Sequence, residues 1–139
     1  LLNNFMEENM AVLWSNDLIV GVDTIDNQHK GIFIRTNNLL DAMILGKGKE
    51  DIVEVIEYIG EHFNTEENLM AKYNYISYVK QKTEHMLFIK YFFGIKRELE
   101  TQGVSSLLLI QTHQRVYNWL KNHIANEDKK FCMFIKKCA

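Results

Sequence analysis

The chain of 139 residues contains no proline, only seven glycines and only two cysteines. Because proline interrupts helices and glycine weakens them, this composition favours long, continuous helices. Cys132 and Cys138 lie six residues apart near one end of the chain. Two cysteines so placed cannot cross-link a whole fold, so we expect reduced thiols rather than a disulfide framework.

An excess of charge of one sign is also missing. Sixteen Lys and Arg residues against eighteen Asp and Glu residues give a formal net charge of −2. No broad basic surface is therefore available to attract a nucleic-acid backbone, and we expect no nucleic-acid partner.

Long apolar runs are absent as well. The run from Val104 to Ile110 is broken by two serines and is far below the roughly 20 residues that a membrane-spanning helix needs. Asn3, Asn4 and Glu7 would interrupt the apolar core of a secretory signal. We therefore expect a soluble, cytoplasmic protein with no membrane partner. The sequence does not determine the oligomeric state, and a monomer is the default expectation.

The chain has the size and composition of one globular domain, with 47% apolar and 24% charged residues. It contains neither a fixed-period repeat nor a low-complexity linker at which it would divide. We assign residues 1–13 to an N-terminal arm and residues 14–139 to a single domain.

Apolar residues recur at intervals of three and four, as they do on one face of an amphipathic helix. This periodicity predicts helices over about 25–45, 49–73, 77–103 and 105–125, with a shorter helical tail over 128–137. Helices of this length are about 30 Å long, and short connections make them antiparallel neighbours. The predicted fold class is all-α: an antiparallel up-and-down four-helix bundle with a short C-terminal helical tail.

Four of the five histidines fall one on each predicted helix. At about 100° per residue, His62 and Glu66 share the apolar face of the second helix. Gln81 and His85 share the apolar face of the third helix, and His123 ends the apolar stripe of the fourth. Polar side chains from different helices are therefore expected to face the same core.

Two further positions are judged by the same helical arithmetic. Asp128 lies five residues after His123 and about 140° off its face in a regular helix. It can reach the same site only if the helix winds wider there, as at a π-bulge, or breaks. His113 lies about 80° off the stripe of His123, so we expect it at the surface or at the boundary of the core.

A lone core histidine is more often hydrogen-bonded than metal-bound, but an unpaired buried carboxylate costs several kcal/mol unless it is paired or coordinated. The joint pattern therefore favours a metal site. The donors are too many for one tetrahedral zinc ion and include no thiolate, whereas two iron ions bridged by carboxylates fit better. The candidate ligands are His29, His62, Glu66, His85, His123 and Asp128.

Segments on all four predicted helices resemble the hemerythrin family, specifically its small single-domain bacterial branch. Spacing, residue type and flanking aromatic residues agree over about residues 14–130. The matching positions are Trp14, residues 20–23 (VGVD), 25–26 (ID), 28–30 (QHK) and 62–67 (HFNTEE), Met70, Tyr73, His85, Phe88, and residues 119–124 (WLKNHI) and 128–129 (DK).

The resemblance implies a non-haem centre of two oxo- or hydroxo-bridged iron ions that binds dioxygen reversibly as a hydroperoxide, for carriage, storage or sensing. By the same resemblance, Glu66 and Asp128 would bridge the two irons. Each iron would have two imidazoles, from His29 and His62 at the iron with the open position, and from His85 and His123 at the other.

One position departs from the family pattern. The family has a histidine ligand four residues before the last ligand of the third helix, and Gln81 stands there. An amide is a weaker, neutral donor than imidazole. Gln81 would ligate weakly, orient a water that ligates instead, or act from outside the ligand shell by hydrogen bonding. A second function is thereby left open, a di-iron oxidoreductase acting on peroxide or nitric oxide, so the sequence does not decide whether the protein is an enzyme.

An apolar lining would exclude water from bound dioxygen. Ile25, Phe63 and Trp119 are the candidate lining residues, and ordinary core packing accounts for each of them equally well. A third hypothesis, a metal buffer or sensor, rests only on the basic tail over residues 129–139. A solvated helix end is the simpler interpretation of that tail.

Overall fold

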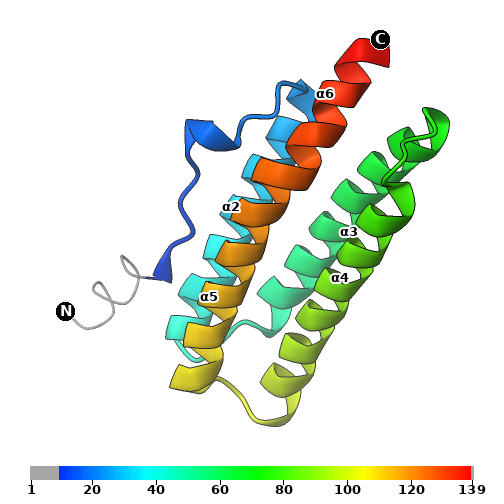
Figure 1. Ribbon diagram of the computed structural model, residues 1–139. Helices are drawn as coiled ribbons and strands as arrows, with labels where there is room; N and C mark the ends of the chain where they lie inside the picture. Colours follow the sequence, from blue (N-terminus) through cyan, green and yellow to red (C-terminus); the bar gives the residue numbers. More distant parts are fainter. Residues whose placement is uncertain (1–9, 139) are drawn as a thin grey trace.

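Four long helices lie side by side and alternate in direction, with α2 and α5 on one side and α3 and α4 on the other (Figure 1). The computed structural model describes residues 10–138. The prediction of an all-α four-helix bundle is confirmed. The elements are η1 (Asn16–Leu18), α2 (Asp23–Ile44), α3 (Lys49–Lys72), α4 (Tyr78–Thr101), α5 (Ser106–Asn122), η2 (His123–Asp128) and α6 (Lys129–Cys138).

The fourth helix differs from its prediction. It does not end near residue 125 before a separate tail, because α5, η2 and α6 follow one another without a loop. The segment η2 is a π-helical turn. The chain from Ser106 to Cys138 is therefore one continuous rod, and the predicted tail is its last part.

Helix ends follow from local chemistry. The Oγ of Ser105 accepts a hydrogen bond from the backbone N–H of Leu108 at 3.0 Å, which caps α5. Gly46 and Gly48, between α2 and α3, have φ angles of 75° and 130°, values that favour glycine. Ser77 occupies the N-cap position of α4, but its side chain makes no capping hydrogen bond.

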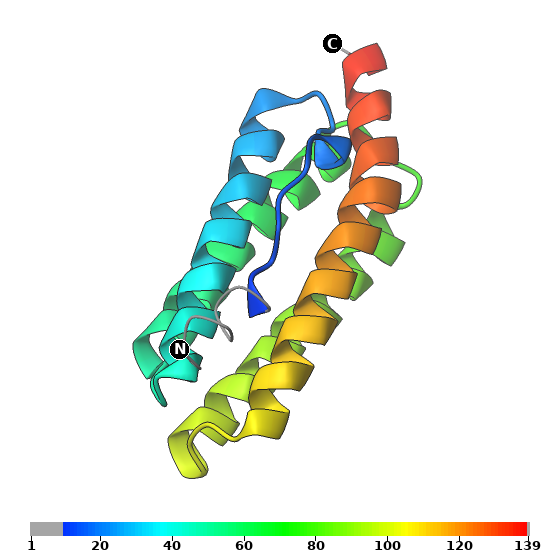
Figure 2. The same ribbon diagram turned by 90° about the vertical axis from the view of Figure 1, so that its left-hand side faces the viewer.

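The segment from residue 10 to the start of α2 lies over α2 and α5 (Figure 2). The backbone N–H and C=O of Val12 bond to the side chain of Asn37 at 2.7 and 3.0 Å. The phenol of Tyr117 donates to the carbonyl of Leu13. Residues 10–13 of the predicted arm thus contact the bundle, whereas residues 1–9 lie outside the described residues. The division of the chain at residue 14 stays a prediction.

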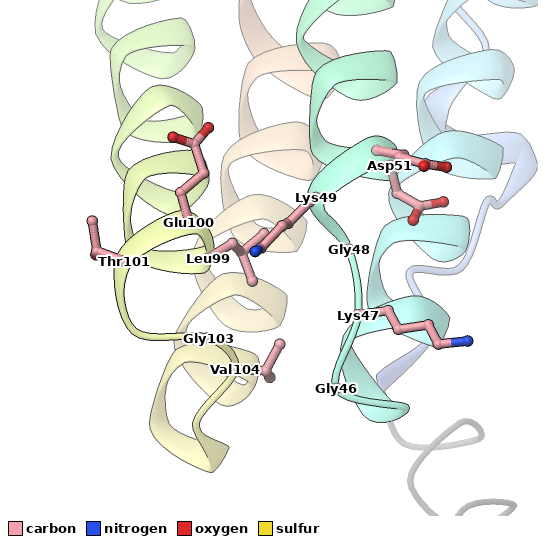
Figure 3. A pocket seen from close by; sticks show the side chains of 11 residues that line it. Gly46, Lys47, Gly48, Lys49, Asp51, Leu99, Glu100, Thr101, Gly103 and Val104 are labelled. Atoms are coloured by element: carbon pink, nitrogen blue, oxygen red, sulfur yellow. The ribbon is translucent and has the colours of Figure 1, made fainter.

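The two ends of the bundle differ. At the end where α2 joins α3 and α4 joins α5, a hollow of about 610 Å³ lies between the connections, and Lys49 points into it (Figure 3). Lysines and acidic residues line it together, and it contains none of the predicted ligands. Across residues 10–138, no helix has the length and apolar character needed to cross a membrane.

Candidate metal centre

The six candidate ligands come from three helices and the π turn, and all of them are buried. None has more than 5% of its surface exposed. The other buried residues within residues 10–138 are mostly apolar, so these side chains form a polar cluster inside a largely hydrophobic interior. They are His29 on α2, His62 and Glu66 on α3, His85 on α4, and His123 and Asp128 in η2.

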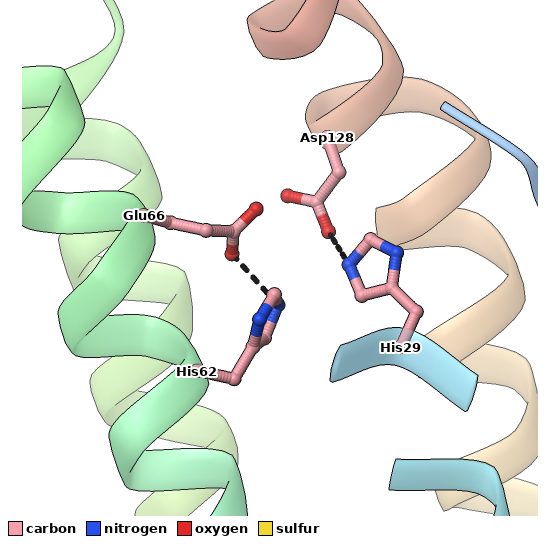
Figure 4. Close-up of side chains that lie close together, drawn as sticks. All are labelled: His29, His62, Glu66 and Asp128. Carbon is pink, nitrogen blue, oxygen red and sulfur yellow. Dashed lines mark ion pairs between the residues drawn. The ribbon is translucent and has the colours of Figure 1, made fainter. Parts of the chain in front are cut away.

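The cluster divides into two groups that share both carboxylates. Within each group, one donor atom from every residue lies within 4.8 Å of those of the others. Glu66 and Asp128 belong to both groups and face each other from α3 and η2 (Figure 4). One group adds His29 and His62, and the other adds His85 and His123.

Four imidazole Nε2 atoms point toward this pair of carboxylates. The Nε2 of His29 lies 3.0 Å from Oδ2 of Asp128, and that of His62 lies 3.1 Å from Oε1 of Glu66 (Figure 4). The Nε2 of His85 lies 3.5 Å from Oε1 of Glu66, and that of His123 lies 3.3 Å from Oδ1 of Asp128. Each imidazole thus presents the same ring nitrogen to the centre.

The π turn brings Asp128 into this cluster. In a regular helix, residues 123 and 128 would lie about 140° apart, but the wider winding of η2 places their side chains on one face. The sequence left two alternatives here, a wider turn or a break in the helix, and the structure has the wider turn. Such π turns are frequent at functional sites.

Three of the imidazoles have a polar partner at Nδ1, the ring nitrogen that faces away from the carboxylate pair. The Nδ1 of His62 lies 2.7 Å from Oε1 of Gln28, whose Nε2 donates to the Oγ1 of Thr65. Since that bond fixes the amide with its oxygen toward His62, the imidazole N–H lies on Nδ1 and the Nε2 lone pair faces the centre.

Carboxylates hold the other two rings in the same way. The Nδ1 of His85 lies 2.9 Å from Oε2 of Glu67, and that of His123 lies 3.2 Å from Oε2 of Glu84. The Nδ1 of His29 has no hydrogen-bond partner among the described residues. Imidazoles backed by carboxylates are more basic ligands, so the group of His85 and His123 is the more electron-rich of the two.

Aromatic rings cover two of the imidazoles. Phe63 stacks on His85 with 3.8 Å between ring centroids and 3° between planes. Trp119 stacks on His123 at 4.2 Å and 12°. Two of the three predicted lining residues, Phe63 and Trp119, therefore contact the cluster, and the third, Ile25, is fully buried. That the three line a dioxygen pocket stays a prediction.

The protonation pattern of the metal-free cluster follows the distances. Burial lowers the pKa of His62 to about 4 and that of His85 to about 3, so both imidazoles are neutral. Burial and the nearby Asp128 raise the pKa of Glu66 well above its usual range.

The pKa of Asp128 is shifted in the opposite direction. Burial alone would raise its pKa, but hydrogen bonds with His123 and His29 hold it well below its usual range. Burial is the largest single influence on His123 and opposes its charged form, but the hydrogen bond and charge of Asp128, together with the nearby carboxyls of Glu66 and Glu84, outweigh burial and raise the pKa of this imidazole. In the absence of a metal, we therefore place the proton of the carboxylate pair on Glu66.

Several nitrogen and oxygen atoms of the cluster that could bind a metal have no hydrogen-bond partner among residues 10–138. They include both oxygens of Glu66 and the Nε2 of His62, because the 3.1 Å approach of His62 Nε2 to Glu66 Oε1 does not have the geometry of a hydrogen bond. Buried polar atoms rarely remain unpaired, and cations bound by imidazole and carboxylate would satisfy them. The residues present therefore fit a pair of divalent or trivalent metal ions.

Gln81 is fully buried beside the same centre. Its Nε2 lies 3.4 Å from Oδ1 of Asp128, and its Oε1 has no hydrogen-bond partner among the described residues. The amide thus has a free oxygen at the edge of the second group. His113, in contrast, is half-buried and lies near the carbonyl of Ala11, outside the cluster.

Sequence analysis gave no role to Gln28, Glu67 and Glu84, although Gln28 and Glu67 lie in segments that match the family. Each is the chain neighbour of a predicted ligand or bridge and supports an imidazole on another helix. Their positions beside His29, Glu66 and His85 were the available signal. Which imidazole each one would meet depends on how the helices pack.

Comparison with known proteins gives a consistent result. The model of the hemerythrin HHE cation binding domain matches residues 20–135. The chain is 33% identical over 132 residues to a bacteriohemerythrin of Stenotrophomonas maltophilia, covering 91% of this chain and 84% of that protein. It is 36% identical over 122 residues to a bacteriohemerythrin of Pseudomonas aeruginosa (84% and 76%) and 30% identical over 118 residues to a hemerythrin-like protein of Naegleria gruberi (85% and 88%). On the family match and the buried cluster together, the chain belongs to the hemerythrin family.

Proposed function

We propose that this protein binds dioxygen reversibly at two iron ions held inside the bundle. The observation that carries the proposal is the pair of carboxylates, Glu66 and Asp128, shared by two groups that each contain two imidazoles. This donor set suits a carboxylate-bridged pair of irons. When bound, the two irons supply the electrons that reversible dioxygen binding requires.

Each iron would be bound by two imidazoles and by the two shared carboxylates. His29 and His62 would bind one iron and His85 and His123 the other, while Glu66 and Asp128 would contact both. Gln28, Glu67 and Glu84 keep the N–H of their partner imidazoles on Nδ1, which leaves Nε2 free to ligate. The ligands are thereby oriented before any metal binds.

Water exclusion is the second contribution of the chain. All six proposed ligands are at most 5% exposed, and the rings of Phe63 and Trp119 lie against two of them. A dry, apolar surrounding limits proton delivery to bound dioxygen. Reversible binding is favoured over further reduction for this reason.

Iron binding and optical spectroscopy test the proposal. Anaerobic loading with Fe²⁺ should give two ions per chain, and dioxygen should then produce a charge-transfer colour that disappears on deoxygenation. His62→Asn should abolish the colour, whereas His113→Asn, outside the cluster, should keep it. A single ion per chain, or irreversible bleaching on the first exposure, would contradict the proposal.

A second candidate function is a di-iron oxidoreductase that acts on peroxide or nitric oxide. The observation that favours it is Gln81, whose buried amide replaces an imidazole donor of the family beside the second group. This function predicts catalytic turnover of peroxide or nitric oxide by the iron-loaded protein. Gln81→His should suppress that turnover, and unchanged turnover would exclude the role assigned to Gln81.

A further inference from the structure

The outer face formed by α3 and α4 carries a groove of about 350 Å³. The two helices are antiparallel neighbours on the side of the bundle away from α2 and α5 (Figure 1). Residues seven apart in a helix lie nearly on one line, so positions seven before or after a groove residue belong to the same face, which we call the α3–α4 face. The groove residues include Ile56, Gly60 and Asn64 of α3 and Lys82, Met86 and Ile89 of α4.

An exposed apolar line runs along α4 on the α3–α4 face. Val79, Met86 and Phe93 follow one another at intervals of seven residues and are 77%, 61% and 53% exposed. Val53, seven residues before Gly60, adds an apolar side chain on α3 and is 36% exposed. Single exposed apolar residues need no explanation, but an aligned set of them beside a groove marks an interaction surface.

Unpaired cations accompany this line on α4. Lys90 and Arg97 each follow an apolar residue of the line by four positions, so they lie on the same side of the helix. Lys82 lines the groove itself. All three are exposed, and none forms an ion pair with a carboxylate among residues 10–138. The α4 half of the face is therefore apolar and positively charged.

The α3 half of the face is negatively charged. Glu57 lies seven residues before Asn64, and Glu50 lies seven residues before Glu57. Glu61 lies four residues after Glu57. These three carboxylates are exposed and, within the described part of the chain, form no ion pair. The two halves of the face thus have opposite charges that are not neutralised within one chain.

The opposite charges lie at the same height along the bundle. Phe63 of α3 lies against His85 and Phe88 of α4, with ring centroids 3.8 and 6.4 Å apart. Because the helices are antiparallel and each rises about 1.5 Å per residue, Glu57 is level with about residue 93 of α4. That position is midway between the last two of the three unpaired cations.

Charge decides how two copies of this face could meet. In a symmetric dimer, the two-fold axis lies in the plane between the two faces. An axis at right angles to the helices places α3 opposite α3 and α4 opposite α4, so that like charges meet at a cost in binding free energy. An axis parallel to the helices places α3 of each copy opposite α4 of the other at the same height. Carboxylates then meet cations twice, so the face is complementary to itself.

We propose that the α3–α4 face is the interface of a homodimer, in which Glu57 of each copy lies between Lys90 and Arg97 of the other. The exposed apolar line of α4 supplies the rest of the contact. This association differs from the monomer expected by default from the sequence, and it does not depend on the function proposed above.

The size of the face sets the expected affinity. From Val79 to Arg97, α4 is about 27 Å long, and two adjacent helices are about 20 Å wide. The dimer buries about 500 Å² per copy, or about 1,000 Å² in total, which is the lower limit for a specific interface. We therefore expect a reversible dimer with a dissociation constant in the micromolar range.

Sedimentation velocity of the full metal-free chain tests the association. Between about 1 and 500 µM, the chain should change from monomer to dimer. Added NaCl should weaken the dimer severalfold, because salt screens the exposed charges. A monomer at every concentration would overturn the proposal.

Charge reversals test the arrangement of the two copies. Glu57→Lys and Arg97→Glu each place like charges opposite one another in both symmetric contacts, so each variant alone should dimerise at least tenfold more weakly. In an equimolar mixture the two reversed residues face each other, and the unchanged Glu57 faces the unchanged Arg97. The mixture should therefore associate more tightly than either variant alone. Failure of the mixture to do so would overturn the proposed arrangement.

A third variant tests the apolar line. Phe93→Ala should weaken the dimer about tenfold, whereas Ile34→Ala should leave it unchanged, because Ile34 is an exposed apolar residue of α2, outside the face, at 59% exposure. Equal effects of the two substitutions would overturn the assignment to the α3–α4 face. Binding to phosphatidylserine vesicles without self-association would instead assign the face to an anionic lipid surface and would also overturn the proposal.

Discussion

His123 and Asp128 face each other with 3.3 Å between Nε2 and Oδ1, although five residues separate them in a continuous helical rod. The π turn η2 alone makes this approach possible. Because Asp128 also lies 3.0 Å from His29 on α2, this one turn joins the two groups of donors through a single carboxylate.

Glu66→Gln should have opposite effects with and without metal. Burial raises the pKa of Glu66, so its carboxyl group must take up a proton on folding, and this uptake lowers the stability of the metal-free fold increasingly as the pH rises above the unfolded pKa. The neutral amide removes this penalty, and the metal-free variant should be more stable at pH 7 by about 1 to 3 kcal/mol in urea unfolding. The same variant should take up less Co²⁺. Glu61→Gln, at an exposed position of α3, should change neither property.

Acid should destabilise the metal-free protein through its imidazoles. His62 and His85 have folded-state pKa values of about 4 and about 3, below the ordinary 6.5. Their stabilising contribution is complete above pH 6.5 and is lost as the pH falls toward 4 and 3. The free energy of unfolding should fall by up to about 1.4 kcal/mol per pH unit for each imidazole. His62→Asn should flatten the slope measured between pH 6 and pH 4, and an unchanged slope would contradict this origin.

Substitution of Gln81 should reveal whether it ligates a metal, directly or through water, or only forms a hydrogen bond. Gln81→His adds an imidazole donor beside the second group and should raise Co²⁺ affinity about tenfold or more. Gln81→Leu removes the free amide oxygen. A loss of affinity in Gln81→Leu indicates ligation, directly or through water, whereas an unchanged affinity indicates hydrogen bonding to Asp128 alone. Calorimetric titration distinguishes these results.

Glu67→Gln should weaken metal binding although Glu67 is not itself a proposed ligand. The carboxylate of Glu67 lies 2.9 Å from Nδ1 of His85, and loss of such an outer partner lowers metal affinity about 10- to 100-fold. The weakened affinity should belong to one of two ions, which a biphasic Co²⁺ titration would show. Glu57→Gln, exposed on the same helix, is the control. Equal weakening of both ions would contradict the separate role of His85.

The extent to which sequence predicts this centre depends on the kind of relationship involved. Glu66 follows His62 by four residues, so helical geometry alone places both on one face. The wide turn was predicted as one of two conditions, because Asp128 could reach the site of His123 only through a wider turn or a break in the helix. In contrast, the contact of Glu84 with His123 joins α4 to η2, and only the packing of helices determines it.

The wide turn also sets the rotation of everything that follows it. One additional residue in a regular helix turns the remainder by about 100°. The turn absorbs that residue, so Phe131 and Cys132 stay fully buried while Lys129 and Lys130 stay exposed. Because of this local change in winding, the buried face of the last ten residues of the rod continues the buried face of its first seventeen.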